Sequence, residues 1–170
     1  MKDKTFVRDV ADRFGCDDRR AETLIFAVFQ ELRDRLTPAE AADVAAQLPA
    51  SLKMLWLSFD YPDRRVRRVH EYQFLEEVRR MVGLEDASRA EEAVVSVFSV
   101  LQEALGSPSG RQGEARHVFS QLPSDLKQLW LSAADQNVSA QPRLPLSCHI
   151  RSSLWTKRQG RDKLNTSRFT

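Results

Sequence analysis

The chain has 170 residues, of which 42% are hydrophobic and 29% charged, a composition typical of a soluble globular domain. No apolar run approaches the roughly 20 residues that a membrane span needs, and no apolar signal core follows the first basic residues, so we expect a cytoplasmic protein. The two cysteines lie far apart, which argues against a disulfide framework and a cysteine metal site.

The first predicted element is a short amphipathic helix that ends at a glycine. Phe6, Val10 and Phe14 are spaced four apart, which places them on one helical face. Gly15 follows directly, and glycine accepts the left-handed conformation that ends many helices. The same pattern returns at residues 74–83, so the sequence predicts two such helices.

A longer amphipathic helix is predicted next in each half. Apolar residues recur at helical spacing at residues 24–36 and again at residues 94–105. Two aspartates at residues 17–18 supply an acidic N-terminus to the first of these helices. Ser88 and Glu91 fit a capping box at the start of the second.

Thr37, Pro38 and Glu40 predict the start of a third helix, because a Thr cap, Pro at the first helical position and Glu three residues after the cap coincide. The matching connection in the second half, residues 106–113, is longer and rich in glycine, and it predicts a flexible loop. This loop lacks the Gly-Lys-Ser/Thr ending of a phosphate loop and follows a helix, which argues against a nucleotide site.

The last element of each half has nearly the same sequence. Residues 47–58 and 121–132 are identical at nine of twelve positions. In both segments Gln-Leu-Pro ends one helix, and the proline begins a short apolar helix that contains Leu-Trp-Leu. This repetition indicates an internal duplication.

Together these elements predict an all-α fold, in which two similar four-helix repeats pack around a shared core with pseudo-two-fold symmetry. We place the duplicated domain at residues 1–135, with repeats at 5–60 and 71–134, and a basic, disordered C-terminal tail at 136–170. A single repeat of about 55 residues would bury only about 60% of its unfolded surface. Two repeats that share one core are therefore more stable than one alone.

Charge is divided unevenly between the predicted domain and the tail. The formal net charge is +2. Residues 136–170 contain seven Lys or Arg and one acid, Asp162, and so carry +6, which leaves −4 on the rest of the chain. The apolar stripe disappears there, and Pro142 and Pro145 interrupt the segment. Such a tail suits an acidic partner, an anionic lipid or a nucleic acid, and is equally consistent with an extension that has no function.

The order of these motifs resembles a bacterial family catalogued as domain of unknown function 2267. Each copy opens with Phe-x-x-x-Val, at residues 6–10 and 74–78, and closes with Gln-Leu-Pro-x-x-Leu-x-x-Leu, at residues 47–55 and 121–129. The resemblance implies the two-copy helical fold and supplies no catalytic residue. The tail falls outside the pattern.

The repeated tryptophans and lysines admit two interpretations each. Trp56 and Trp130 could be binding hot spots, but large aromatics at helical spacing usually fill the core, which we favour. Lys53 and Lys127 could bind an anion, and we favour exposed lysines whose stems cover the edge of the core. A DNA-recognition role for the helix after Pro49 is disfavoured, because its side chains are mostly apolar.

Basic side chains are the candidate binding residues. Four arginines between the repeats could contact phosphate or pair with nearby acids, and we favour the pairing. The acids near enough in sequence are Asp60, Asp63, Glu71, Glu76 and Glu77. The candidate anion or partner contacts are Arg64, Arg65, Arg67, Arg68, Arg151, Lys157, Arg158, Arg161 and Lys163.

No catalytic, metal or cofactor site is predicted. His70, His117 and His149 lack ligand spacing to one another and to the cysteines. The acid pairs at residues 76–77 and 91–92 lie on or near first helical turns, where the helix dipole accounts for them. No nucleophile, base and orienting group can be assembled, so we predict a protein that is not an enzyme.

The predicted function is a non-enzymatic helical interaction or scaffold module that binds an unknown protein partner or self-associates. The alternative is binding of a nucleic acid or anionic surface through residues 64–68 and the tail. If all six net charges of the tail meet duplex phosphates, the logarithm of affinity should fall against log salt with a slope of about −5. A small-molecule binder or enzyme in the groove between the copies is the least supported class.

Overall fold

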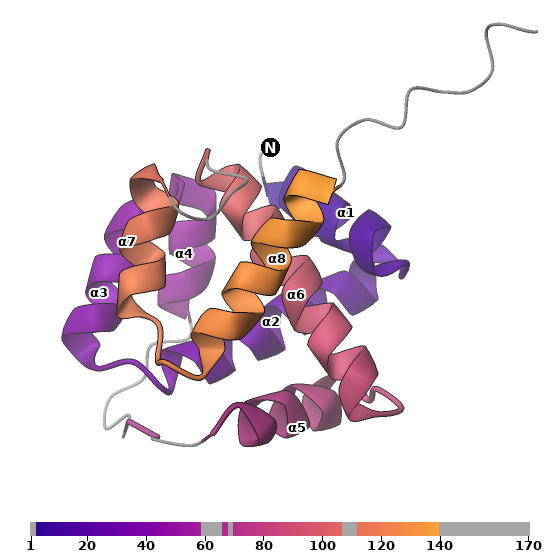
Figure 1. Ribbon diagram of the computed structural model, residues 1–170. Helices are drawn as coiled ribbons and strands as arrows, with labels where there is room; N and C mark the ends of the chain where they lie inside the picture. Colours follow the sequence, from indigo (N-terminus) through magenta and orange to yellow (C-terminus); the bar gives the residue numbers. More distant parts are fainter. Residues whose placement is uncertain (1–2, 59–65, 68–69, 107–111, 140–170) are drawn as a thin grey trace, which may run out of the picture. The chain divides into compact units, whose positions relative to one another are not determined.

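Eight α-helices form the part of the chain that the computed structural model describes, which confirms the all-α prediction (Figure 1). The described residues are 3–58, 66–67, 70–106 and 112–139, and they contain no strand. None of their helices is both long and apolar enough to cross a membrane. The helices are α1 Asp3–Phe14, α2 Asp18–Arg33, α3 Pro38–Gln47, α4 Ala50–Ser58, α5 Glu71–Val82, α6 Ala87–Ala104, α7 Gly113–Gln121 and α8 Leu126–Ser139.

Local signals predicted from the sequence are found at the end of α1 and at the starts of α2 and α3. α1 stops before Gly15, whose φ of 75° lies in the left-handed region. Asp17 caps α2 by accepting a hydrogen bond from the backbone nitrogen of Arg20 at 2.8 Å. In α3 the Glu40 nitrogen donates to Thr37 Oγ1 at 3.2 Å, and the Thr37 nitrogen donates to Glu40 Oε2 at 2.7 Å. These bonds satisfy donors that a helix start would leave unpaired.

The second repeat follows the same signals, with one correction at α6. α5 ends at Gly83, which has a φ of 69°. The cap of α6 is Asp86, whose Oδ1 accepts from the backbone nitrogen of Arg89 at 2.8 Å. The predicted capping box at Ser88 and Glu91 is therefore wrong, since Ser88 lies inside the helix. Aspartate and serine are comparable caps, so local sequence preference did not separate them.

The two Gln-Leu-Pro segments open helices of different extent. α4 begins directly after Pro49, as predicted. The prediction that α8 begins at Pro123 is wrong, because the helix begins only at Leu126, after a turn in which the Leu126 nitrogen donates to the Pro123 carbonyl at 3.0 Å. α8 then continues to Ser139, beyond the predicted end of the helical domain, and its last turn buries Asn137. The last turn of α8 was not predicted, because the sequence after residue 135 is mostly polar.

The helices of the two repeats are interleaved. α1 packs on α6 of the second repeat as well as on α2, and α5 packs on α2 of the first repeat as well as on α6. α3 packs against α7, and α8 packs across α6 (Figure 1). The apolar stripes of the long helices α2 and α6 are therefore each covered by α1 from the first repeat and α5 from the second.

All eight helices contribute side chains to one hydrophobic core. Trp56 is 1% exposed and Trp130 is 0% exposed, which confirms that the duplicated tryptophans are core residues. The ring centroid of Trp56 lies 5.6 Å from that of Phe29, and the ring centroid of Trp130 lies 5.4 Å from that of Phe98. Such aromatic pairs add about 0.5–1.5 kcal/mol beyond burial. The repeats are alike at these contacts, and the overall two-fold symmetry stays a prediction.

A polar network fastens the last turn of α8 to α1 and α6. Asn137 Oδ1 accepts from Arg13 Nη1 at 2.8 Å, and Asn137 Nδ2 donates to Gln102 Oε1 at 3.1 Å. Arg13 Nη2 also bonds Glu103 Oε1 at 2.9 Å, and the Ser99 hydroxyl contacts both Arg13 and Asn137. The residues just after position 135 therefore belong to the helical unit.

Candidate functional site

Four charged side chains are buried near the end of α2. Glu31 and Arg33 are each 3% exposed, and Asp34 and Arg35 are each 5% exposed. Charged side chains are almost never buried to this degree unless they are paired. This segment is therefore the strongest candidate site among the described residues.

Arg35 and Glu31 form a buried ion pair one helical turn apart. Arg35 Nη1 donates to Glu31 Oε2 and to the Glu31 backbone carbonyl, both at 2.7 Å. The two side chains are only 2% and 4% exposed. On α5, the ring centroid of Phe74 lies 4.8 Å from the guanidinium carbon of Arg35. The carboxylate and the ring together restrict the guanidinium to one orientation.

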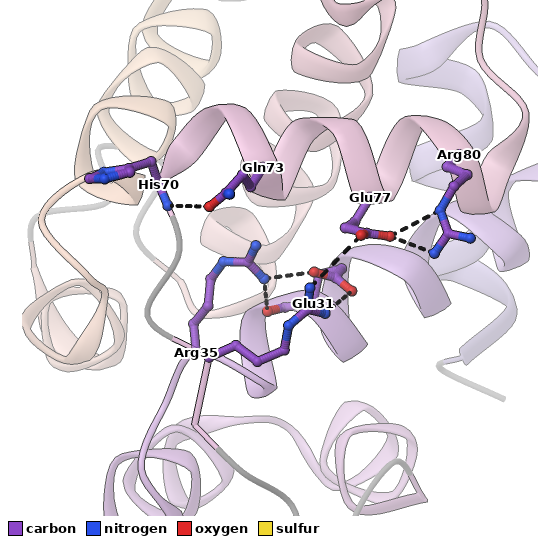
Figure 2. A network of polar contacts seen from close by, with 7 residues as sticks. Glu31, Arg35, His70, Gln73, Glu77 and Arg80 are labelled. Atoms are coloured by element: carbon purple, nitrogen blue, oxygen red, sulfur yellow. Dashed lines mark hydrogen bonds and ion pairs between the residues drawn. The ribbon is translucent and has the colours of Figure 1, made fainter.

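Arg67, from the segment between the repeats, joins this ion pair to α5. Its Nη1 lies 3.7 Å from Glu31 Oε1, and its Nη2 lies 3.8 Å from Glu77 Oε1. Its backbone nitrogen donates to the Asp34 carbonyl at 2.8 Å. Figure 2 shows Glu31 and Glu77 turned toward each other from α2 and α5, with Arg80 beside Glu77. Two arginines and two glutamates thus form a connected network across the two repeats.

The buried and exposed members of this network contribute differently to stability. Removing one partner of a buried ion pair costs about 3–5 kcal/mol, because the other charge is left unpaired in a poorly solvated site. That cost applies to Glu31 and Arg35. The hydrogen bond from Arg80 to Glu77 raises the pKa of Arg80, but exposed pairs of this kind contribute little.

A cavity of about 390 Å³ adjoins the network. Its walls come from the end of α2, the start of α3, the segment between the repeats and the turn between α7 and α8. Arg35 and Arg67 both line it. So do His70 and Asp125, whose Nδ1 and Oδ2 atoms are 3.5 Å apart. The cavity therefore lies between the two repeats, with charged groups from both.

One edge of the Arg35 guanidinium is not used by the network. Its Nε and Nη2 atoms are buried and have no hydrogen-bond partner among the described residues. These two nitrogens form a parallel pair of N–H donors, which matches the two oxygens of a carboxylate. The Nη1 atom, by contrast, is occupied by Glu31.

Arg33 has a different, structural position. Its Nη1 donates to the backbone carbonyl of Trp56, and its guanidinium carbon lies 5.5 Å from the Trp56 ring centroid. This carbonyl lies in the last turn of α4, where helices leave acceptors unpaired. In the second repeat Gln102 Nε2 donates to the carbonyl of Trp130 at 2.7 Å. Arg33 and Gln102 therefore hold equivalent helices against the core.

Comparison with protein families agrees with this helical architecture. The family described as uncharacterized conserved protein (DUF2267) matches residues 3–129, and a further match covers residues 71–148. The chain belongs to the DUF2267 family. No curated protein matches the chain. The DUF2267 description assigns no function, so the site has to be judged on its own chemistry.

In this DUF2267 chain, the structure describes one of the predicted contact residues. Arg67 pairs with Glu77, an expected partner, and also with Glu31, which was not expected. Glu76, attributed above to the helix dipole, forms an ion pair with Arg79 at 2.6 Å. The other predicted contacts lie outside the described residues, namely Arg64, Arg65, Arg68, Arg151, Lys157, Arg158, Arg161 and Lys163.

Sequence reasoning missed Glu31 and Arg35 altogether. They lie within the helix that was predicted from its apolar stripe at residues 24–36, and no charged residue of that helix was singled out. One signal was available. In the alignment that matches the two Phe–Trp contacts, the second repeat has Val100 and Ala104 at these positions, so the charges are specific to the first repeat.

Metal and thiol chemistry gain no support from the described residues. No group of three or more of their His, Cys, Asp or Glu side chains could hold a metal ion. Cys16 is a half-buried free thiol. Burial, followed by the charge of Asp17, raises its pKa, which lowers the reactive thiolate fraction.

Proposed function

We propose that this chain is a cytoplasmic, non-enzymatic helical interaction module that self-associates through α4. The observation that carries the proposal is a pair of exposed apolar side chains on α4, Met54 at 71% and Leu57 at 42% exposure. Three residues apart, they are neighbours on the helix surface. The matching residues of α8 are Gln128, which is polar, and Leu131, which is half-buried. The apolar pair is therefore specific to the first repeat.

The packing of α4 leaves this face open. α4 packs chiefly on α3, and its buried side chains Leu52 and Trp56 point to the core. α8, by contrast, packs on α6. Covering an exposed apolar pair is favourable, since each square ångström removed from water contributes about 25 cal/mol.

A second copy of the chain is the occupant that fits this face. In two antiparallel α4 helices related by a two-fold axis, Met54 of each copy lies opposite Leu57 of the other, so the contact is self-complementary. Lys53 then lies opposite Ser58, and no like charges meet. The patch is small beside the roughly 800 Å² per partner of a standard interface, so we expect a weak, concentration-dependent dimer.

Sedimentation velocity of the full chain over a range of concentrations tests the proposal. Met54→Glu should weaken dimerisation at least about tenfold, because it places a carboxylate in an apolar contact. Tyr72→Glu is the matched control, since Tyr72 is 69% exposed on α5, and it should leave the dimer unchanged. Helicity measured by circular dichroism should be the same for both variants. A chain that is monomeric at every concentration, or an equal loss in both variants, contradicts the proposal.

Nucleic-acid or anionic-surface binding through the linker and tail stays the alternative proposal. The described linker residue Arg67 is already paired with Glu31 and Glu77, which reduces the free charge that the linker offers to phosphate. The measurement remains the salt dependence of affinity, with a slope of about −5 expected for six phosphate contacts.

A further inference from the structure

We propose that the cavity between the repeats binds a small monocarboxylic acid, with its carboxylate on the free Nε–Nη2 edge of Arg35. This inference goes beyond the proposed self-association and uses a different part of the molecule. It depends on the donor geometry of Arg35, on the charge balance of the site and on the apolar walls of the cavity.

The donor geometry favours a planar, two-oxygen acceptor. Glu31 holds Nη1 of Arg35, and the Phe74 ring lies 4.8 Å from the guanidinium carbon. Nε and Nη2 are buried without a hydrogen-bond partner among the described residues. A carboxylate can accept from both nitrogens at once, and a charge-assisted bidentate pair is roughly twice as strong as a neutral one. Figure 2 shows the Arg35 guanidinium between Glu31 and the start of α5, where His70 and Gln73 lie.

The charge balance selects a monoanion over a dianion. Glu31 and Glu77 pair with Arg35 and Arg67, so the positive charge of these two arginines is already compensated beside the cavity. Glu40 and Asp125 also line the cavity, so a ligand with two negative charges meets additional repulsion. A single carboxylate gains the Arg35 hydrogen bonds and meets about half of that repulsion.

The walls and size favour an apolar body on the acid. Leu36, Val66, Leu122 and Pro123 line the cavity beside the charged groups. Its volume of about 390 Å³ lies near the lower end of the range for small-molecule sites, roughly 300–1,000 Å³. A compact aromatic or aliphatic acid fits that space. Because Nε and Nη2 of Arg35 are buried, side chains that cover them have to shift before a ligand can reach these atoms.

A second cavity of the same protein provides an internal comparison. It has a volume of about 360 Å³ and adjoins the end of α6, the start of α1 and the turn at Pro49. At the positions that match Glu31 and Arg35, its lining residues are Val100 and Ala104. The second cavity thus lacks the arginine edge, and we expect it to leave carboxylates unbound.

Titration of the ¹⁵N-labelled full chain with sodium benzoate tests the site. The side-chain Nε–Hε NMR signal of Arg35, assigned by its loss in Arg35→Lys, should shift saturably with a dissociation constant on the order of 1 mM. Arg35→Lys keeps a positive charge toward Glu31 but lacks the two-nitrogen edge, and it should weaken binding at least about tenfold. Sodium sulfate at equal ionic strength should produce a much smaller shift.

Two tryptophan variants test the site without replacing Arg35. A folding defect caused by an Arg35 substitution therefore cannot affect their result. Ser124 is exposed and lines the cavity, so Ser124→Trp should block benzoate while leaving the Nε–Hε signal of Arg35 in place. Ser88→Trp, at an exposed position on α6, is the matched control and should bind as the natural sequence does. An Arg35 signal that does not respond, equal binding by Ser124→Trp, or sulfate as effective as benzoate would overturn the proposal. None of these results depends on whether α4 dimerises.

Discussion

At the scale of single residues, the unusual feature is a pair of charges placed in the protein interior. Glu31 and Arg35 lose most of their hydration, and their mutual hydrogen bonds only partly offset that cost. Replacing such a pair with well-packed apolar side chains is often neutral or stabilising. The second repeat has Val100 and Ala104 in the matching places, so the fold does not require the charges. Their presence beside a cavity agrees with a role in binding.

Glu71 provides a pH-dependent prediction at the same scale. Burial, followed by the charges of Glu91 and Asp125, raises its pKa above the ordinary value of 4.5. The stabilisation linked to a raised pKa is present below the unfolded-state pKa and is lost as pH rises through the folded-state pKa. The ionised group therefore destabilises the protein at pH 7. We expect Glu71→Gln to raise the melting temperature at pH 7 and to lose this advantage below about pH 4.

The neighbouring Glu76 serves as a control of opposite sign. A hydrogen bond from Arg79 lowers the pKa of Glu76, so its stabilisation is present above the unfolded-state pKa and is lost as pH falls through the folded-state value. Glu76→Gln should therefore lower the melting temperature at pH 7 and converge with the natural sequence in acid. Thermal unfolding from pH 3 to pH 8 would distinguish Glu71→Gln from Glu76→Gln. Changes in melting temperature of the same sign in both variants at pH 7 would contradict these pKa shifts.

At the scale of helices, local signals predicted several boundaries and misplaced one cap. The capping box at Thr37 and Glu40 formed as predicted. For α6 the sequence predicted a cap at Ser88, whereas the structure uses Asp86 and the helix begins at Ala87. Aspartate and serine are comparable caps, so cap preference alone does not decide between them.

The cap of α6 leads to a paired prediction. Asp86→Ala should destabilise the protein by about 0.5–2 kcal/mol, because the Arg89 nitrogen loses its acceptor. Ser88→Ala removes an exposed side chain inside the helix and should change stability by less than about 0.5 kcal/mol. Urea unfolding followed by circular dichroism measures both. A larger loss of unfolding free energy in Ser88→Ala than in Asp86→Ala would instead support Ser88 as the cap.

At the scale of the whole molecule, the interleaving of the repeats makes them interdependent. α1 covers part of α6 and α5 covers part of α2, so each repeat lacks part of its cover without the other. The final turn of α8 takes part in this assembly through the bonds of Asn137 to Arg13 and Gln102. The described helical unit therefore extends to Ser139, beyond residue 135.

Two truncations distinguish these boundaries. A chain that ends at Ser139 should keep the helicity and cooperative unfolding of the full chain, since every described helix is retained. A chain that ends at Asp135 loses Asn137 and leaves Arg13 and Gln102 with fewer partners, which should cost about 1–3 kcal/mol. Chemical denaturation of the three chains measures the difference. Equal stability of the two truncated chains would show that the last turn is dispensable.

The sequence by itself determined the helical class, the near-identity of residues 47–58 and 121–132 and the burial of Trp56 and Trp130, because periodicity, caps and repetition are local signals that survive without tertiary contacts. It also indicated that the arginines between the repeats pair with nearby acids, and the structure shows one such pair, Arg67 with Glu77. Only the tertiary structure brought the Glu31–Arg35 pair together with Arg67 and Glu77 beside a cavity, since these side chains come from the end of α2, the segment between the repeats and α5. The burial of a charge depends on what covers it, and in this protein the cover comes from distant parts of the chain.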